Sequence, residues 1–191
     1  MPFDEARARA AVEELLAALG ADRPDLAGTP GRVAEAYAEM LSGTDVDAAA
    51  ILADGTVALA EPPSETVALR DIPFRSVCEH HLLPFAGTAG VAYLPRDSVA
   101  GLGRIARAVD AVASRLQLQE RLTEELATAV EAGLAARGVL VVLSASHSCL
   151  WARGSRTAGA SAVTVAARGD FADPALRAEA FALLTGGGRD A

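Results

Sequence analysis

The sequence predicts an α+β fold in which two helices lie on one face of an antiparallel four-stranded sheet, behind an N-terminal helical arm. Apolar side chains recur at helical spacing within residues 5–41, and β-type runs occur within residues 66–94 and 139–167. Two amphipathic helical segments lie between those runs, within residues 99–137. The resulting order of strand, strand, helix, helix, strand, strand favours two helices packed on a single sheet.

Two helices are expected in the arm. Apolar residues at helical spacing within Glu5–Leu19 are followed by Gly20, which suits the position just after a helix. Thr29 and Pro30 are typical of an N-cap followed by proline at the first helical position. We expect the second helix to run from there to about Leu41.

Helical periodicity weakens between residues 44 and 63, and we interpret this segment as a linker. It predicts a division of the chain into an arm with linker, residues 1–63, and an α+β domain, residues 64–191. The expected elements of that domain follow in chain order. The first is β-type sequence that begins near Thr66–Leu69 and continues through the Cys78 region. It is followed by a strand near Thr88–Leu94, helices at Val99–Leu116 and Glu120–Arg137, strands at Val139–Arg153 and Ala160–Ala167, and a short helix after Asp173.

Composition argues against several classes of function. A formal net charge of −8 and a pI near 4.9 make the chain a poor nucleic-acid binder, because phosphate backbones require a basic surface. No window reaches the roughly 20 consecutive apolar residues of a membrane span, and the N-terminal residues lack the apolar core of a secretory signal. We expect a cytoplasmic protein without nucleic-acid or membrane partners, whose two cysteines are ligands or nucleophiles rather than a disulfide.

The two cysteines and three histidines of the chain all fall into two short clusters. Cys78, His80 and His81 form the first cluster, and His147 and Cys149 form the second. Residues that only pack in a core would not gather in this way. Cys78 and His81 have the two-residue gap that is common between metal ligands, and a strand would project His147 and Cys149 from the same face. The pattern predicts a metal site.

Mixed thiolate and imidazole ligands favour zinc. A structural site would close with four protein ligands, whereas a catalytic site keeps three and leaves a position for water. Five candidate ligands are compatible with either arrangement, so residue spacing alone does not exclude a closed Cys₂His₂ site. A catalytic site would have a use for the spare histidines, because imidazole gives and takes protons near neutral pH.

Four segments of the chain resemble the GTP cyclohydrolase I family. They are similar to its N-terminal helices, its metal-binding signature, its helix with purine-binding segment, and its second metal strand. In chain order they are LLAALGADRPDLAGTPGRVAEAY, SVCEHHLLPFAGTAGVAYLP, GLGRIARAVDAVASRLQLQERLT and SASHSCLWARG. The resemblance spans about residues 12 to 184.

This resemblance implies a zinc enzyme that hydrolyses and rearranges GTP to 7,8-dihydroneopterin triphosphate and releases formate. Cys78, His81 and Cys149 would bind Zn²⁺ and leave one position for a water molecule that attacks C8 of guanine. His80 and His147 match the family's acid–base histidines. The product of such an enzyme feeds folate and other pterin or deazapurine routes.

The resemblance also implies the substrate contacts. Gln119 and Glu120 match the guanine-recognition pair, and a carboxylate suits guanine because it accepts hydrogen bonds from N1–H and the exocyclic amine. Arg107 and Arg153 match triphosphate contacts, and Arg104 stands where the family has lysine. Arg104 and Arg107 are three residues apart on one expected helix, so their side chains can converge.

Three positions depart from the family pattern. Gly103 and Ala160 stand where serine is usual, and Ala162 stands where threonine is usual. Together they remove three hydroxyl groups that could donate hydrogen bonds to phosphate. Arg104 in place of lysine carries less weight, because this chain contains no lysine.

The fold implied by the resemblance is of the tunnelling type, assembled into a toroidal homodecamer with active sites at subunit interfaces. Two alternatives remain. One is a paralogous purine or pterin enzyme with altered phosphate recognition. The other is a non-catalytic assembly protein with a structural zinc.

Overall fold

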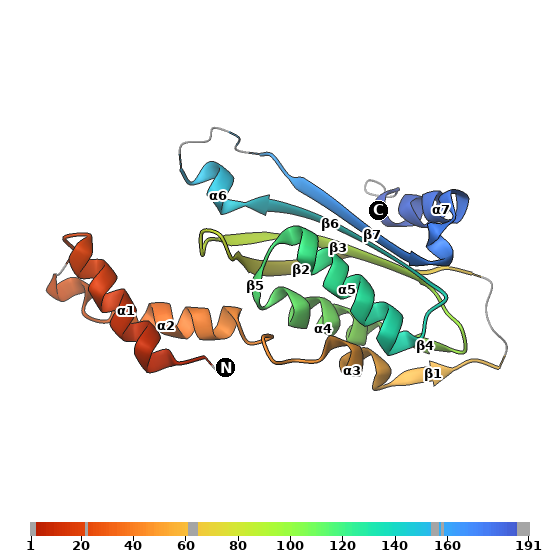
Figure 1. The fold of residues 1–191 in the computed structure, drawn as a ribbon, viewed down its shortest axis with the longest axis horizontal. Coiled ribbons are helices and arrows are strands. Elements are labelled where there is room, and N and C mark those ends of the chain that lie inside the picture. Colours follow the sequence, from red (N-terminus) through yellow and green to blue (C-terminus); the bar gives the residue numbers. More distant parts are fainter. Residues whose placement is uncertain (1–2, 22, 61–64, 154–156, 158, 187–191) are drawn as a thin grey trace, which may run out of the picture.

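The computed structural model describes residues 3–21, 23–60, 65–153, 157 and 159–186. Two helices form an arm that extends to one side of an α+β body (Figure 1). The helices are α1 (Glu5–Ala18), α2 (Thr29–Met40), α3 (Ala48–Ala53), α4 (Leu102–Ala113), α5 (Gln119–Leu134), α6 (Ser148–Trp151) and α7 (Pro174–Thr185), with short 3₁₀ turns η1 (Pro24–Leu26) and η2 (Asp170–Ala172). The strands are β1 (Thr56–Ala58), β2 (Val67–Cys78), β3 (Pro84–Leu94), β4 (Ser98–Ala100), β5 (Leu116–Gln117), β6 (Gly138–His147) and β7 (Ala162–Gly169).

The arm consists of α1 and α2, close to where the sequence predicts two helices. Asp4 caps α1 by accepting a hydrogen bond from the backbone N–H of Arg7, and Pro30 lies in the first turn of α2. Neither these nor the other described helices have the length and apolar character needed to cross a membrane.

The body contains a five-stranded sheet in the order β5-β2-β3-β6-β7. Its four long strands are antiparallel, as the sequence predicts. The fifth strand, β5, has two residues and runs parallel to the end of β2, pairing Gln117 with Cys78. The prediction of a four-stranded, wholly antiparallel sheet is therefore wrong. Two residues are too few to show an alternation of polar and apolar side chains. In addition, Leu116, the first residue of β5, was included in the expected helix Val99–Leu116.

The segment interpreted as a linker contains ordered structure. It holds α3, which Asp47 caps by accepting from the N–H groups of Ala49 and Ala50, and then β1, which pairs with β4 in a separate two-stranded sheet. Leu52 of α3 is fully buried in the main core. The predicted boundary between residues 63 and 64 lies outside the described residues, so the division of the chain there stays a prediction.

Helices cover both faces of the sheet. Because side chains alternate along a strand, odd and even positions of β3 and β6 point to opposite faces. The odd positions pack with α4 and α5 in the main core, which includes Val91, Tyr93, Val141, Leu143, Ile105 and Leu126. The even positions pack with η2 and α7 in a smaller core of Ala92, Leu94, Leu140, Val142, Phe171, Ala180 and Leu184 (Figure 1).

The two ends of the sheet can be named by what lies there. β2 ends at Cys78, and we call this the Cys78 end. At the opposite end, Tyr93 pairs with Val67, the first residue of β2, and its hydroxyl accepts a hydrogen bond from the N–H of Ala100 in β4. We call this the β4 end. Helix α4 begins there and runs for 12 residues, about 18 Å at 1.5 Å per residue, towards β5 at the Cys78 end.

Candidate functional site

The first cluster lies in a tight turn that joins β2 to β3, residues 78–83, which we call the metal loop. Cys78 closes it with two backbone hydrogen bonds, since its N–H donates to Leu83 and its carbonyl accepts from Leu82, at 2.9 and 2.8 Å. Leu82 has a φ of 53°, which is a left-handed conformation that leucine rarely adopts. The hydroxyl of Tyr37 on arm helix α2 donates to the carbonyl of Leu82 at 2.7 Å. Hydrogen bonds within the loop and one hydrogen bond from the arm therefore hold its backbone in place.

The second cluster does not continue along a strand, contrary to the sequence-based expectation of a strand over Val139–Arg153. Strand β6 ends at His147, and Cys149 lies on the single helical turn α6. The expected projection of His147 and Cys149 from the same face of one strand is therefore wrong. Helical backbone brings Cys149 back over the end of the sheet, whereas an extended chain would carry it onwards. Because His147 pairs with Phe85 of β3, this turn lies beside the metal loop.

Three of the five candidate ligands meet at the Cys78 end, and we call these three residues the metal group. The sulfur atoms of Cys78 and Cys149 and a ring nitrogen of His81 all lie within 4.8 Å of one another. Tetrahedral zinc with ligands at about 2.0–2.3 Å places its ligand atoms roughly 3.3–3.8 Å apart, so a small closure of the side chains suffices. Within the described part of the chain, no further histidine, cysteine or carboxylate belongs to this group. The donor set fits zinc with three protein ligands.

The two remaining histidines flank this group in different surroundings. His80 is exposed on the loop, and its ring lies edge-on to that of His81 with the centroids 6.3 Å apart. The ring of His147 stacks flat on buried Phe85, with the centroids 4.6 Å apart and the planes 4° from parallel. Its Nδ1 atom is buried and has no hydrogen-bond partner in the structure. Phe85 therefore fixes the plane of an imidazole that has an unused polar atom.

Arg153 also reaches the metal group, although it lies beyond β6 and α6. Its guanidinium donates to Nε2 of His81 at 2.6 Å. A guanidinium carries only donors, so this nitrogen is the acceptor. Arg153 thus adds a positive charge to the edge of the candidate site.

The candidate guanine-recognition pair begins helix α5. Because β5 pairs with the end of β2, the start of α5 lies at the Cys78 end. Gln119 is 3% exposed, and its side-chain amide donates to the carbonyls of Leu143 and Ala162 and to the hydroxyl of Thr164. Its Oε1 is buried without a partner, which leaves an acceptor available to a ligand. Glu120 is exposed in the first turn, where the helix dipole favours a carboxylate.

Arg104 and Arg107 do not join the metal group within one chain. They line a shallow hollow at the β4 end, together with Gly55, Gly101 and Gly103. Arg104 forms an ion pair with Asp54 at 2.8 Å. The two arginines therefore line one hollow, with Arg104 in the first turn of α4, far from the metal loop, and Arg107 half-way along the helix.

Sequence reasoning missed an ion pair that involves the metal loop. Glu79, between two of the clustered residues, contacts the guanidinium of Arg121, one residue beyond Glu120. This hydrogen bond lowers the pKa of the Glu79 carboxyl and raises the pKa of Arg121, so both groups are held in their charged forms. Both residues stand inside the segments CEHH and QERLT, yet no spacing rule connects positions 42 residues apart.

Comparisons with known proteins show the family of this chain. The GTP cyclohydrolase I family model matches residues 8–185. A GTP cyclohydrolase 1 of Leifsonia xyli subsp. xyli is 60% identical, over 95% of this chain and 96% of its own length. That of Rhodopirellula baltica is 49% identical over 95% of this chain and 79% of its own length. Among solved structures, the archaeosine synthase QueF-Like in the apo form aligns with a TM-score of 0.45 and 24% identity, over 57% of this chain and 97% of its own. The chain belongs to the GTP cyclohydrolase I family.

Proposed function

We propose that the chain is a zinc-dependent GTP cyclohydrolase I, which converts GTP to 7,8-dihydroneopterin triphosphate and formate. The observation that carries this proposal is the group formed by Cys78, His81 and Cys149 in a chain of that family. Two thiolates and one imidazole would hold the ion. When bound, zinc supplies a water molecule whose pKa is lowered towards about 7, which is a nucleophile at neutral pH.

His80 and His147 are the proposed proton carriers. Opening the imidazole ring of guanine requires protons to be given to ring nitrogens and taken from the attacking oxygen, which suits two imidazoles. His147 is supported by its fixed plane against Phe85 and by the unpartnered Nδ1 atom. His80 is supported by its place on the metal loop, beside His81.

Gln119 and Glu120 are the proposed contacts to the guanine base. The buried, unpartnered Oε1 of Gln119 can accept a hydrogen bond from a guanine N–H. The carboxylate of Glu120 can accept from two neighbouring donors, N1–H and the exocyclic amine. Arg153, which lies at the edge of the metal group, is the proposed phosphate contact from the same end.

Arg104 and Arg107 are proposed to bind the triphosphate of a site completed by another copy of the chain. The hollow that they line lies on the first half of α4, away from the metal loop, which supports this assignment. It agrees with a tunnelling-type assembly into a toroidal homodecamer, with sites between subunits.

The test is an assay of GTP turnover by reduced, zinc-loaded protein, with mass detection of formate and of the pterin product. We expect both products, and we expect a chelator to abolish them and added zinc to restore them. A known cyclohydrolase run in parallel is the control. If it forms both products while this protein forms neither, the proposal fails.

A second candidate is a paralogous enzyme with altered phosphate recognition. It is favoured by the ion pair of Arg104 with Asp54 and by the missing hydroxyls at Gly103, Ala160 and Ala162. Turnover of GTP, GDP, GMP and guanosine would separate the two candidates. A steep loss of kcat/KM with each phosphate removed supports the triphosphate substrate, whereas equal or better turnover of GMP supports the paralogue.

A further inference from the structure

Arg121 joins the metal loop to the helix that carries the proposed base contacts. It lies in the first turn of α5 and contacts Glu79 of the loop. Its guanidinium also donates to the carbonyl of Leu116 at 3.2 Å and to Oε1 of Gln117 at 3.0 Å, both on β5. One side chain therefore touches the loop, the parallel strand and its own helix.

The partners of Arg121 are themselves held in place. Gln117 is 1% exposed, and its amide donates to the carbonyl of Val112 and to the carboxylate of Glu125. Glu125 accepts a further hydrogen bond from Arg115, whose guanidinium also donates to the backbone carbonyls of residues 43 and 46. The contact to Glu79 is thus the outer end of a connected polar network anchored in the body.

We propose that Arg121 is a positioning residue, which holds Glu79 and thereby fixes the metal loop against the start of α5 before any metal binds. The proposal deepens the proposed function, since it concerns the loop that would carry two of the zinc ligands. Glu79 lies directly between Cys78 and His80 in the chain, so a shift of Glu79 moves both. Arg121 directly follows Glu120, so the same pair sets the spacing between the metal group and the base contact.

A fixed loop lowers the entropy that the ligands lose when a metal binds. Pairs beside a metal site have larger effects on metal affinity than their modest contribution to overall stability indicates. We expect loss of the pair to loosen the metal loop and to weaken zinc binding, each by roughly three- to tenfold.

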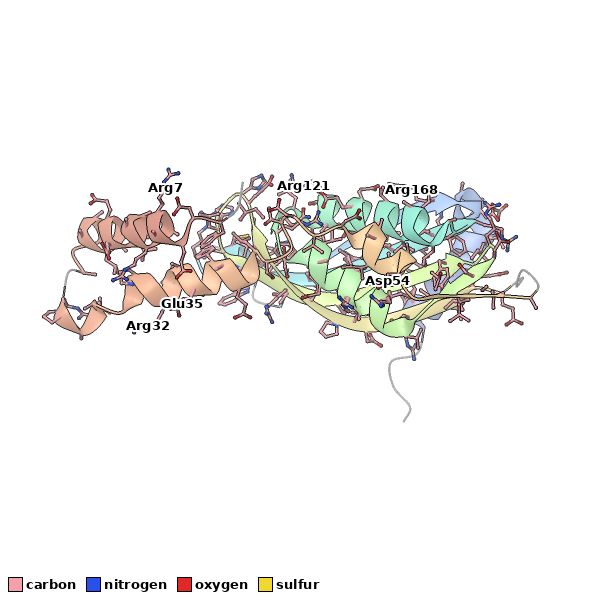
Figure 2. All side chains as sticks on the ribbon, turned by 90° about the horizontal axis from the view of Figure 1, so that it is seen from below. Arg7, Arg32, Glu35, Asp54, Arg121 and Arg168 are labelled. Atoms are coloured by element: carbon pink, nitrogen blue, oxygen red, sulfur yellow. The ribbon has the colours of Figure 1, made fainter. Side chains whose placement is uncertain are left out.

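The chain offers a matched control on the same helix. Glu124 of α5 forms an ion pair with Arg168 of β7, and the side chains of this pair are 53% and 31% exposed. The corresponding values for Glu79 and Arg121 are 30% and 42%. Each pair ties α5 to another element, but Arg168 pairs with Val139 at the β4 end, away from the metal loop. Figure 2 shows Arg121 and Arg168 apart from each other. If the pair of Glu79 and Arg121 had a purely structural role, loss of either ion pair should affect the metal loop equally.

The first measurement is hydrogen exchange of peptides covering residues 78–83 in reduced, metal-free protein, followed by mass spectrometry. We expect Glu79→Gln and Arg121→Gln each to accelerate exchange in this loop roughly three- to tenfold, and Arg168→Gln to leave it unchanged. The double variant should not exceed Arg121→Gln, because that change already removes the contact that Glu79→Gln removes. Arg121→Lys should restore part of the protection. Loop exchange at the wild-type rate in both single variants, or additive effects in the double variant, would overturn the proposal.

The second measurement is zinc affinity, determined by competition with a chelating dye. We expect weaker binding in Glu79→Gln and Arg121→Gln and unchanged binding in Arg168→Gln. Equal weakening in all three variants would indicate a general loss of structure and would overturn the positioning role. The exchange experiment needs neither zinc nor GTP, so its failure is distinguishable from failure of the proposed function.

Discussion

The two ends of the sheet are organised in opposite ways. At the Cys78 end, three potential ligands converge within one chain, and backbone and side-chain hydrogen bonds hold the metal loop. At the β4 end, Arg104 and Arg107 line an open hollow of glycine backbone, and an exposed carboxylate, Asp54, is paired with Arg104. Under the proposed function, the zinc ligands would come from a single chain, whereas the contacts of Arg104 and Arg107 to the triphosphate would depend on how the chains assemble.

The largest expected effect is at the Cys78 end. Cys149→Ser removes one of two thiolates, and a serine hydroxyl is a poor zinc ligand at neutral pH. We expect zinc affinity to fall more than about a hundredfold and GTP turnover to be lost, as measured by metal analysis and formate release. The neighbouring Ser148→Ala should retain both. Full zinc content in Cys149→Ser would remove this residue from the ligand set.

His147→Ala separates metal binding from proton transfer at the same end. We expect zinc content to stay at the wild-type level and kcat to fall by about 10²- to 10⁴-fold, because a general acid–base group is lost. The measurement combines metal analysis with steady-state kinetics. Loss of zinc in this variant would instead move His147 into the ligand set.

At the β4 end, Arg104→Gln should affect GTP binding without affecting the metal. Removing a charged hydrogen-bond donor to phosphate is expected to raise KM for GTP by between about tenfold and a hundredfold, with zinc content unchanged. Asp54→Asn should act in the opposite direction and lower KM a few-fold, because Arg104 then no longer has to give up its ion pair with a carboxylate in order to bind phosphate. An unchanged KM in both variants would exclude Arg104 from the phosphate site.

The substitution Tyr93→Phe tests how much the β4 end contributes to the stability of the fold. Its buried hydroxyl accepts from the N–H of Ala100, just before α4, so Tyr93→Phe leaves that N–H unpaired and should lower the free energy of unfolding by about 1–3 kcal/mol. Burial also raises the pKa of Tyr93 above its ordinary value of 10.0, with a smaller opposite effect from the Ala100 N–H.

The sign of the pH dependence follows from this shift. The neutral phenol is favoured in the folded state, so its contribution is complete below about pH 10 and is lost as pH rises through the raised pKa. Tyr93→Phe should therefore reduce the alkaline loss of stability in denaturant titrations. The same alkaline loss in Tyr93→Phe would contradict this account.

Much of the fold could be predicted because the long elements have clear patterns. The helices and long strands that form the main core carry the expected spacing of apolar residues. The elements that the sequence did not reveal are short. β5 has two residues, and α3 is a single alanine-rich stretch of six residues, too brief for a helical period to be recognised. The turn α6 was hidden because Cys149 and Trp151 happen to continue the alternation of β6.

The candidate site was predictable in part for a related reason. Cys78, His81 and Cys149 come from two short motifs whose residue types are informative by themselves. The distance of Arg104 from that group depends on the path of the chain through β4 and α4, which residue spacing does not encode. The pairing of Glu79 with Arg121 joins a loop to a helix distant in sequence, so only the folded chain reveals it.

Both cysteines of the chain belong to the metal group. The thiol reagents commonly used to count cysteines therefore measure occupancy of the centre directly, with no labelled residue elsewhere to subtract. Metal-free, reduced protein should release two equivalents of chromophore per chain, and fully loaded protein should react far more slowly. Because zinc is spectroscopically silent, this built-in reporter offers a simple way to follow loading during purification and assembly.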